Sequence, residues 1–361
     1  MKIAFYGSSL LSSYWNGAAT YYRGLIRALA CRGHDLAFFE PRAFDRQLNA
    51  DMEPPEWCEV VVYEPDSDGL RHVLAKARCF DVVVKTSGVG VLDTELLEGL
   101  QRGIAPHALY IFWDVDAPAT QAEIANEQDH PLRRILPKLD MVVTYGGGPP
   151  VERRYREFGA CRCNAIYNGL DPETHHPAAP AQAFAADLSF LGNRLPDREA
   201  RVDAFFFDAA RSAPEKNFLI GGSGWNGKSV PPNVRWIGHV STRDHNVFNA
   251  TPRAVLNIAR ESMALVGYSP ATRVFEAAGA GACLVSDQWD GMELFLKPEE
   301  EVLLARDGQD VAEIVRHLTA ERAHEIGQAA LRRVLADHTY DKRAETVEKL
   351  LVSAYAARQV A

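Results

Sequence analysis

The sequence has little of what marks membrane, secreted or nucleic-acid-binding proteins. Its 361 residues contain no apolar run of the roughly 18 residues that a membrane span needs. The first residues, Lys2–Tyr6, read as a strand rather than as a signal peptide. Acidic residues outnumber basic ones by 48 to 39, for a formal net charge of −9, which argues against nucleic acid or an anionic membrane as the main partner. We therefore expect a cytoplasmic protein with no integral membrane segment and no nucleic-acid partner.

Motifs that bind metals or the common nucleotide cofactors are also missing. The six cysteines include one close pair, Cys161 and Cys163, with a single residue between them, whereas zinc pairs of the C-x2-C type have two. His175 and His176 are adjacent, and adjacent side chains of an extended chain point apart. The loop after the first strand has neither the G-x-G-x-x-G pattern of dinucleotide binding nor a Walker lysine. We expect no metal and no bound cofactor.

What the chain does have is an alternation of short apolar strands and amphipathic helices, which is typical of doubly wound parallel sheets. Its length suits two domains, since one hydrophobic core rarely grows beyond about 250–300 residues. Residues 166–186, rich in Pro and Ala after an Asn-Gly turn, read as the connection between them. The predicted fold class is α/β, with two Rossmann-like doubly wound domains that face a central cleft. The predicted strands are Lys2–Tyr6, Asp35–Glu40, Val60–Tyr63, Val82–Lys85, Ala108–Trp113, Met141–Tyr145, Leu188–Gly192, Phe218–Ile220, Val234–Ile237, Ala254–Ile258, Cys283–Ser286 and Val302–Ala305.

The most informative stretch is Tyr268–Asp287, which reads as a loop, a helix over Pro270–Ala280, a tight turn and a buried strand. Ser269 is predicted to cap this helix and Pro270 to open it. A helix N-terminus suits a phosphate group, because its backbone N–H groups are free and its end carries partial positive charge. Glu276, about two turns in, is a candidate acceptor of hydrogen bonds from ribose hydroxyls. The alternative is a capped packing helix whose glutamate faces solvent.

Two carboxylates follow the predicted strand that ends at Trp113. Such a strand end lies at the edge of the sheet where open α/β proteins bind ligands, so Trp113 is expected to line the cleft. Asp114 or Asp116 can orient a hydroxyl or act as a general base, helped by partial burial that raises a carboxyl pKa. Alternatively, one of them caps the next helix, over Ala119–Glu127.

Other loops that follow predicted strands supply further candidates. The remaining residues expected to line the cleft in the first domain are Ser8, Asn16, Gly17, Gly146 and Gly147. An asparagine there equally suits a helix cap, and glycines equally suit a sharp turn. In the second domain a glycine allows close approach of the backbone, and arginine suits a diphosphate because it is always charged and forked. The candidates there are Gly192, Asn193, Arg194 with Arg198 a turn later, Arg260 and Arg273, with Gly238 and His239 for a nucleobase. A lone histidine is otherwise more often structural.

Taken together, these residues resemble the GT-B glycosyltransferases of the CgeB-like group, relatives of spore maturation proteins. The motifs that carry the resemblance are Trp15–Leu25 with Arg32–Asp35, Phe112–Pro118, Phe190–Asn193 and, as the most specific, Tyr268–Asp287. The resemblance extends from the first strand to about Phe295.

The resemblance implies an acceptor-side domain over residues 1–168, a nucleotide-sugar donor domain over residues 169–338, and a helix over residues 339–361 that crosses back to the first domain. It implies that Glu276 holds the ribose and that backbone amides at Ala271 and Thr272 meet the diphosphate, next to Ser269. One position departs from the family pattern: Tyr268 stands where the E-x7-E motif has its first glutamate, which contacts the donor sugar in retaining relatives.

The hypothesis that follows is a metal-independent hexosyltransferase-type glycosyltransferase. It would move a sugar from a nucleotide-diphosphate sugar to a hydroxyl of an acceptor, which is a sugar, a protein, a lipid or a small metabolite. Two alternatives stay open. One is a non-catalytic nucleotide- or sugar-binding protein of surface-layer assembly, favoured by Tyr268, and the other is a GT-B-shaped nucleotide-sugar epimerase.

Overall fold

The computed structural model describes residues 1–14 and 16–360, so Trp15 of the first motif lies outside the described residues. The chain divides into two compact units. The first combines Met1–Tyr167 with Tyr340–Ala361, and the second is Asn168–Thr339. Each unit is built on a parallel sheet of its own.

The sheet of the first unit has seven parallel strands in the order β3-β2-β1-β4-β5-β6-β7. Short runs rich in Val, Ile and Phe that are buried on both faces form the inner strands, as expected in a sheet with helices on both sides, whereas the edge strands β3 and β7 are only partly buried. The strands are β1 (Lys2–Tyr6), β2 (Asp35–Pro41), β3 (Glu59–Tyr63), β4 (Val82–Thr86), β5 (Leu109–Asp114), β6 (Met141–Thr144) and β7 (Cys163–Ala165).

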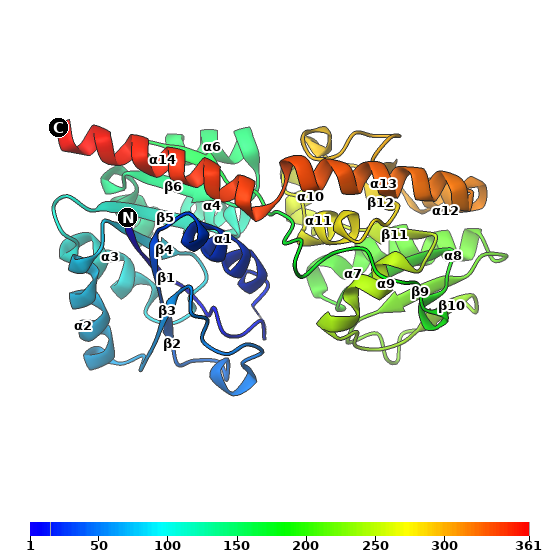
Figure 1. Ribbon diagram of the computed structural model, residues 1–361, viewed down its shortest axis with the longest axis horizontal. Coiled ribbons are helices and arrows are strands. Elements are labelled where there is room, and N and C mark those ends of the chain that lie inside the picture. Colours follow the sequence, from blue (N-terminus) through cyan, green and yellow to red (C-terminus); the bar gives the residue numbers. More distant parts are fainter. Residues whose placement is uncertain (15, 361) are drawn as a thin grey trace. The chain divides into compact units, whose positions relative to one another are not determined.

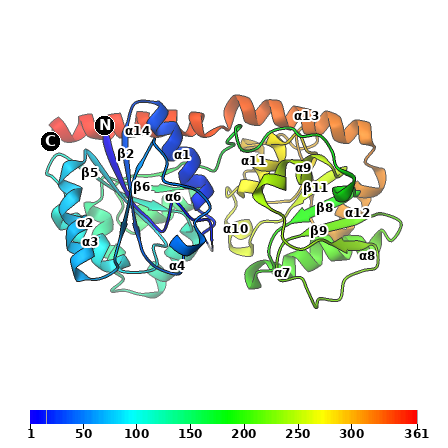
Figure 2. The same cartoon turned by 60° about the horizontal axis from the view of Figure 1, so that its bottom comes forward.

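Helices cover both faces of this sheet. They are α1 (Ala19–Cys31), α2 (Ser67–Lys76), α3 (Asp93–Gly103), α4 (Ala117–Asn126), α5 (Pro131–Ile135), α6 (Gly148–Glu157) and α14 (Tyr340–Val360). The last helix lies beside α1, although some 300 residues separate them in the sequence (Figure 1). Helices α2 and α3 lie side by side on the opposite face (Figures 1 and 2).

The packing of α14 on α1 follows from the spacing of its apolar residues. Tyr340, Ala344, Val347 and Leu351 are buried in the same core as the α1 side chains, and steps of three and four residues place them on one face of a helix. Gly24 of α1 permits the close approach, since a Cβ there would lie 2.2 Å from the Tyr340 ring. The predicted helix over Asp341–Ala356 is therefore present, and it belongs to the first unit.

The sheet of the second unit has six parallel strands in the order β10-β9-β8-β11-β12-β13. Its strands are β8 (Leu188–Leu191), β9 (Phe218–Gly221), β10 (Val234–Trp236), β11 (Ala254–Asn257), β12 (Leu284–Asp287) and β13 (Leu303–Ala305). Its helices are α7 (Pro196–Val202), α8 (Asp208–Ser212), α9 (His245–Ala250), α10 (Glu261–Val266), α11 (Thr272–Gly279), α12 (Gly308–His317) and α13 (Ala320–Asp337). Both sheets have the strand order of doubly wound folds, which confirms the predicted α/β class.

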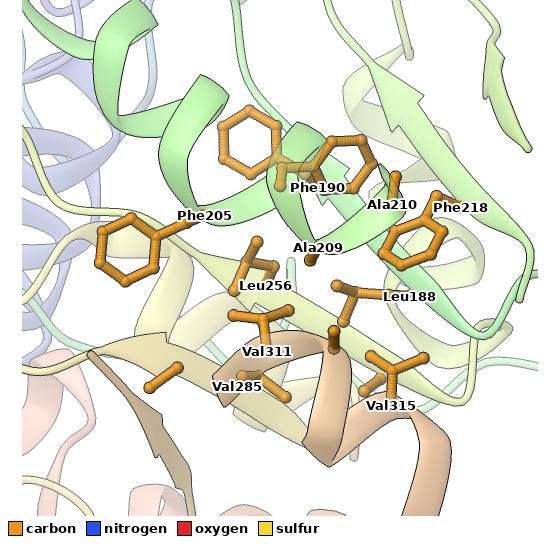
Figure 3. Close-up of a cluster of buried hydrophobic side chains, with 14 of the residues drawn as sticks. Leu188, Phe190, Phe205, Ala209, Ala210, Phe218, Leu256, Val285, Val311 and Val315 are labelled. Carbon is orange, nitrogen blue, oxygen red and sulfur yellow. The ribbon is translucent and has the colours of Figure 1, made fainter. Parts of the chain in front are cut away.

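Aromatic and branched side chains fill the core of the second unit. Figure 3 shows Leu188 and Leu256 of the sheet between Ala209 of α8 and Val311 and Val315 of α12. A single π-helical turn, Asp203–Phe207, joins α7 to α8. Among the described residues, none of the helices combines the length and the apolar character that a bilayer span requires.

Candidate functional site

The strand order of the second unit defines where a ligand is expected. In doubly wound sheets, ligands bind beyond the carboxyl ends of the strands, at the point where the strand order reverses. In this unit the reversal lies between β8 and β11, which are neighbours in the sheet. The loops that begin at Gly192 and at Ile258 therefore border the candidate site.

Three arginines from three elements gather at this edge. Arg198 lies on α7, Arg260 is the N-cap residue of α10 and Arg273 lies on α11. Burial and repulsion from Arg273, with a smaller contribution from Arg260, lower the pKa of Arg198. The side chains of Arg260 and Asp197 form an ion pair. Concentrated positive charge next to a sheet edge is suited to an anionic ligand such as a diphosphate.

A buried carboxylate fixes the loop that carries Arg260. Asp287, at the end of β12, is fully buried and accepts hydrogen bonds from the backbone N–H of Ala259 at 3.1 Å and from Arg201 at 2.6 Å. The side-chain amide of Asn257 also lies near it, 3.5 Å from Oδ1. These bonds hold the chain in place as it leaves β11, immediately before Arg260.

The N-terminus of α11 differs from the prediction in one respect. The helix begins at Thr272, and Ala271 is its N-cap residue, so the predicted cap at Ser269 and first turn at Pro270 were wrong. The Ser269 hydroxyl instead donates to the carbonyl of Gly267 at 3.0 Å, and the side chain of Asn168 donates to the carbonyl of Pro270. Because alanine has no side-chain acceptor, the first N–H groups of α11 have no side-chain cap. An anionic ligand can take that role.

Glu276 lies one turn into α11 and is only 13% exposed. Its Oε2 atom lies 3.9 Å from Arg273 and its Oε1 atom 3.9 Å from Nε2 of His175. Burial alone would raise the pKa of Glu276, but Arg273, His175 and His245 together hold it below its ordinary value. The carboxylate is therefore charged and faces positive or polar neighbours, unlike the solvent-facing glutamate of the alternative prediction.

Two histidines lie beside Glu276 that the sequence did not connect with it. His175 was considered only as a neighbour of His176, and that pair was excluded as a metal site, whereas His245 was not singled out. His175 is buried, and burial together with Arg273 lowers the pKa of His245 to about 4. Neither belongs to a spaced motif, because these two residues and Glu276 come from three separate segments of the chain. Arg198, in contrast, is among the arginines that the sequence analysis offered for a diphosphate.

Tyr268 adopts an unusual backbone conformation at the start of this stretch. Its φ of 49° is in the left-handed region, and its N–H donates to the carbonyl of Asp290 at 2.6 Å. Its ring packs against Gly291. Non-glycine residues in this conformation often occur at functional sites. Here, however, the tyrosine side chain lies against the protein backbone.

The other candidates of the second unit are placed by internal contacts. The Asn193 side chain accepts a hydrogen bond from the backbone of Ser223 at 2.9 Å, and Arg194 pairs with Glu199 at 2.7 Å. Gly192 lies close to the ring of Phe190 and the guanidinium of Arg198. Gly238 has a φ of 75° and accepts a hydrogen bond from the backbone of Gly222, and His239 is exposed. Arg260, Arg273 and Glu276 are thus brought together, whereas Arg194 is engaged in a separate pair.

In the first unit, the two aspartates after β5 have different surroundings. Asp114 is fully buried, and its carboxylate accepts hydrogen bonds from the hydroxyls of Tyr155 and Thr120 and from the backbone N–H of Asp116. Burial raises the pKa of Asp114. Asp116 is half-buried and is the N-cap residue of α4. The geometry thus favours Asp116 over Asp114 as the residue that reaches a ligand.

Several first-unit candidates have structural roles. Trp113 does not line an open edge as predicted: it is buried in the core and donates to the hydroxyl of Tyr21 at 3.1 Å, because alternate residues of β5 face the α1 layer. The Asn16 amide group bonds to Ser8 Oγ and to two backbone carbonyls of the same loop, and so orders the loop after β1. Gly17 is exposed beside it.

The glycines after β6 form a turn. Gly147 has a φ of 84° and is the N-cap residue of α6, a conformation that most side chains avoid. A Cβ there would lie 2.1 Å from Val151. The carbonyl of Gly146 accepts a hydrogen bond from Thr144 at 2.9 Å. The turn alternative is therefore favoured at these two positions.

The chain resembles known proteins in part of its sequence and in its fold. Residues 198–349 match the profile of a family described as "Glycosyl transferase-like". The chain has the GT-B glycosyltransferase fold. Solved structures with this fold match nearly its whole length, although they share so little sequence identity that the likeness concerns the fold alone. No curated protein sequence matches it significantly.

Three solved structures illustrate the likeness. A sucrose-phosphate synthase from Thermosynechococcus elongatus is 15% identical, with a TM-score of 0.69, over 99% of this chain and 100% of that one. Anabaena HepE in complex with UDP and glucose is 13% identical, with a TM-score of 0.68, over 98% and 100%. An alpha-glucosyltransferase in complex with UDP-glucose and DNA is 10% identical, with a TM-score of 0.70, over 97% and 99%.

Proposed function

We propose that this chain is a glycosyltransferase of the CgeB-like group that transfers a hexosyl unit from a nucleotide-diphosphate sugar to a hydroxyl group of an acceptor. The observation that carries the proposal is the cluster of Arg198, Arg260, Arg273 and Glu276 beside the uncapped start of α11. This cluster falls within the residues that match the glycosyltransferase profile. The second unit then binds the donor and the first unit the acceptor.

In this proposal the donor is held by its charges and its ribose. The N–H groups at Thr272 and Arg273 and the arginine side chains bind the diphosphate. The Glu276 carboxylate accepts hydrogen bonds from the ribose hydroxyls, for which its charged state is suited. HepE and the alpha-glucosyltransferase were solved with UDP or UDP-glucose, so UDP is the first nucleotide to test.

Transfer then proceeds with a balanced exchange of bonds. The bond between the anomeric carbon and the diphosphate oxygen breaks, the acceptor oxygen bonds to that carbon, and the hydroxyl proton passes to Asp116 or to the departing phosphate. Negative charge grows on the diphosphate as it leaves, and fixed guanidinium groups and helix N–H groups stabilise such charge without reorganising. These residues supply the stabilisation that a metal ion gives in other transferases, which is why we propose metal-independent turnover.

The variant Asp116→Asn tests the catalytic part of the proposal. It keeps the size of the side chain and removes the base, so release of nucleoside diphosphate from the bound donor should slow by roughly 100-fold or more. The donor Kd should stay within about threefold, since Asp116 belongs to the unit that does not bind the donor. Unchanged turnover in the variant would exclude Asp116 as the base.

The non-catalytic alternative rests on Tyr268, which replaces a family glutamate and packs on Gly291. It predicts donor binding with no release of nucleoside diphosphate from any nucleotide sugar that binds. The wild-type reaction in the same assay therefore distinguishes the two functions.

A further inference from the structure

His175, His245 and Glu276 place three metal-ligating groups together in the second unit. One ligand atom from each of them lies within 4.8 Å of the others, and Nε2 of His175 is 3.9 Å from Oε1 of Glu276. Two histidines and one carboxylate form a ligand set typical of zinc, with a fourth position open to water or to a ligand. We propose that these three residues bind a divalent cation of the zinc class.

The backbone around His175 is held so that its ring stays beside His245. The side chain of Asn246 donates to the carbonyl of Thr174 at 3.0 Å and accepts from the N–H of His176 at 3.2 Å. One amide group thus clamps the chain on both sides of His175, and this amide belongs to the residue after His245. The two rings lie 6.4 Å apart between their centroids.

The same segment is locked against the helix that carries Glu276. A Cβ on Gly279 of α11, three residues after Glu276, would lie 2.4 Å from the side chain of Leu170 and 3.1 Å from the carbonyl of His175. A larger residue at this position would have to displace the Leu170 side chain and press on the carbonyl of His175, so the glycine favours the close approach of the two segments. The three ligands therefore come from segments that are fixed against one another.

Each histidine also forms a contact outside the three proposed ligands, and these contacts fix how the ring is oriented. Nδ1 of His175 lies 3.0 Å from the hydroxyl of Thr174, which leaves Nε2 for the carboxylate side. His245 forms a hydrogen bond with the backbone of Val240. Outer partners of this kind are usual for metal-binding histidines because they fix the tautomer and the ring orientation.

The geometry needs only a small adjustment to take the ion. Zinc–ligand bonds of about 2.0–2.1 Å place tetrahedral ligand atoms about 3.4 Å apart, so the side chains must close by about an ångström. Arg273 faces the other carboxylate oxygen of Glu276, at 3.9 Å. Its positive charge opposes the cation, so we expect an affinity low enough for competition by a bound nucleotide.

A functional consequence follows, and it rests on the proposed function. If Glu276 holds the ribose of the donor, a cation on Glu276 competes with the donor. The cation then acts as an inhibitor of a transferase that needs no metal for turnover.

The test uses Co²⁺ as a probe, because four-coordinate Co²⁺ absorbs visible light much more strongly than the hydrated ion. The full-length protein, free of any histidine tag and stripped of metal, is titrated with Co²⁺ in the absence of nucleotide. We expect an intense visible band that saturates, with a stoichiometry of one Co²⁺ per chain. His175→Ala and His245→Ala should each weaken binding by at least about 100-fold, because each removes one of three protein ligands.

His176→Ala is the matched control, since this histidine adjoins His175 but is exposed and contacts the carbonyl of Pro177. It should bind Co²⁺ like the wild type. The proposal is overturned if the wild type shows no band, or if His176→Ala loses as much Co²⁺ affinity as His175→Ala and His245→Ala. Thermal unfolding of the metal-free variants shows whether each variant is folded. If His175→Ala does not fold, the titration of His245→Ala decides between the outcomes, because His245 is only half-buried and its replacement disturbs the core less.

A second measurement separates this inference from the proposed function. Zn²⁺ should weaken UDP binding to the wild type and have no effect on UDP binding to His245→Ala. A Co²⁺ band without this competition supports the cation site and contradicts the assignment of Glu276 to the ribose. If UDP, GDP, dTDP and CDP all fail to bind, the proposed function fails, and the Co²⁺ titration still decides the site.

Discussion

The two sheets follow the same winding rule, yet the charged residues at their carboxyl edges serve different purposes. In the first unit Glu40, Lys85 and Asp114 are buried and used by the protein itself, unlike the half-buried Asp116. The Glu40 carboxylate accepts hydrogen bonds from the backbone of Leu10 at 2.6 Å and from Ser9 at 3.0 Å, and Lys85 donates to the carbonyl of Thr86 and to Asp93. Asp114 is satisfied in the same way.

In the second unit Asp287 is used in the same way, but positive charge is concentrated at the edge. Arg198 lies close enough to Arg273 and Arg260 to be repelled by both, and Glu276 and Asp197 are the nearby carboxylates that offset this charge. The start of α11 adds further partial positive charge. The comparison teaches that a charged residue at a strand end indicates a ligand site more reliably when several charges of one sign gather there than when a single charge is buried among its own hydrogen-bond partners.

The largest expected effect is the loss of stability when Asp114, a buried charge of the first unit, is replaced. Asp114→Ala would leave the buried hydroxyl of Tyr155 and other donors without their acceptor, so we expect the free energy of unfolding to fall by about 3 kcal/mol or more. Urea unfolding measures it. Asp116→Ala is the control and should lose less than about 1 kcal/mol; similar losses in both variants would contradict the structural role of Asp114.

A large effect on ligand affinity is expected at Arg273. Arg273→Ala should weaken binding of the nucleoside diphosphate by about 10- to 100-fold, because hydrogen bonds between charged groups contribute about 1.5–3 kcal/mol. Arg273→Lys should recover part of the loss, since it restores the charge without the fork. Isothermal titration calorimetry gives both values. An affinity within twofold of the wild type in Arg273→Ala would remove this residue from the site.

A smaller effect is expected at Arg260, which is more exposed. Arg260→Ala should weaken nucleotide binding by about five- to tenfold and change the free energy of unfolding by less than about 1 kcal/mol, as is usual for an exposed ion pair. Arg211 is a matched control because it forms a similar pair with Asp208 on α8. Arg211→Ala should leave the nucleotide affinity unchanged, and an equal loss in both variants would indicate a general charge effect.

The smallest effect is expected at Glu199, which lies in the second unit but outside the proposed ligand site. Hydrogen bonds from Arg194 and Lys228 lower the pKa of Glu199 to about 2. A carboxyl with a depressed pKa stabilises the fold above its unfolded pKa of about 4.3, and this contribution disappears as the pH falls toward 2. Glu199→Gln should therefore unfold at lower urea than the wild type at pH 6, with a smaller difference at pH 3. Its nucleotide affinity should not change, whereas a loss would place the Arg194 pair in the ligand site.

Much of the fold could be predicted because its strands are short apolar runs between turn residues. Each predicted strand has a counterpart within two residues in the structure. The short strand β7 was missed, since Cys163–Ala165 has little β-branched character. The start of α11 was misplaced because Ser-Pro is a common helix opening, whereas in the structure the backbone of Ala271 is still extended and the helix begins at Thr272.

The candidate site was predicted where its residues share a motif or follow a predicted strand. Arg273 and Glu276 lie in one stretch, and Arg198 and Arg260 follow the strands that end near Leu191 and Asn257. The grouping of His175 and His245 with Glu276 could not be predicted, because it depends on long-range packing such as the contact of Leu170 with Gly279. Trp113 was misjudged because the sequence does not show which face of β5 it occupies when the strand is apolar on both faces.

The most direct test of the account is the binding of UDP, GDP, dTDP and CDP to the metal-free wild type and to Glu276→Gln, measured by calorimetry in EDTA. We predict that one of these nucleotides binds without metal and that Glu276→Gln weakens its binding by about tenfold or more, the equivalent of about 1.4 kcal/mol. Failure of all four to bind, or equal affinity in the wild type and the variant, would contradict the claim that the charged edge of the second unit is a nucleotide-sugar site.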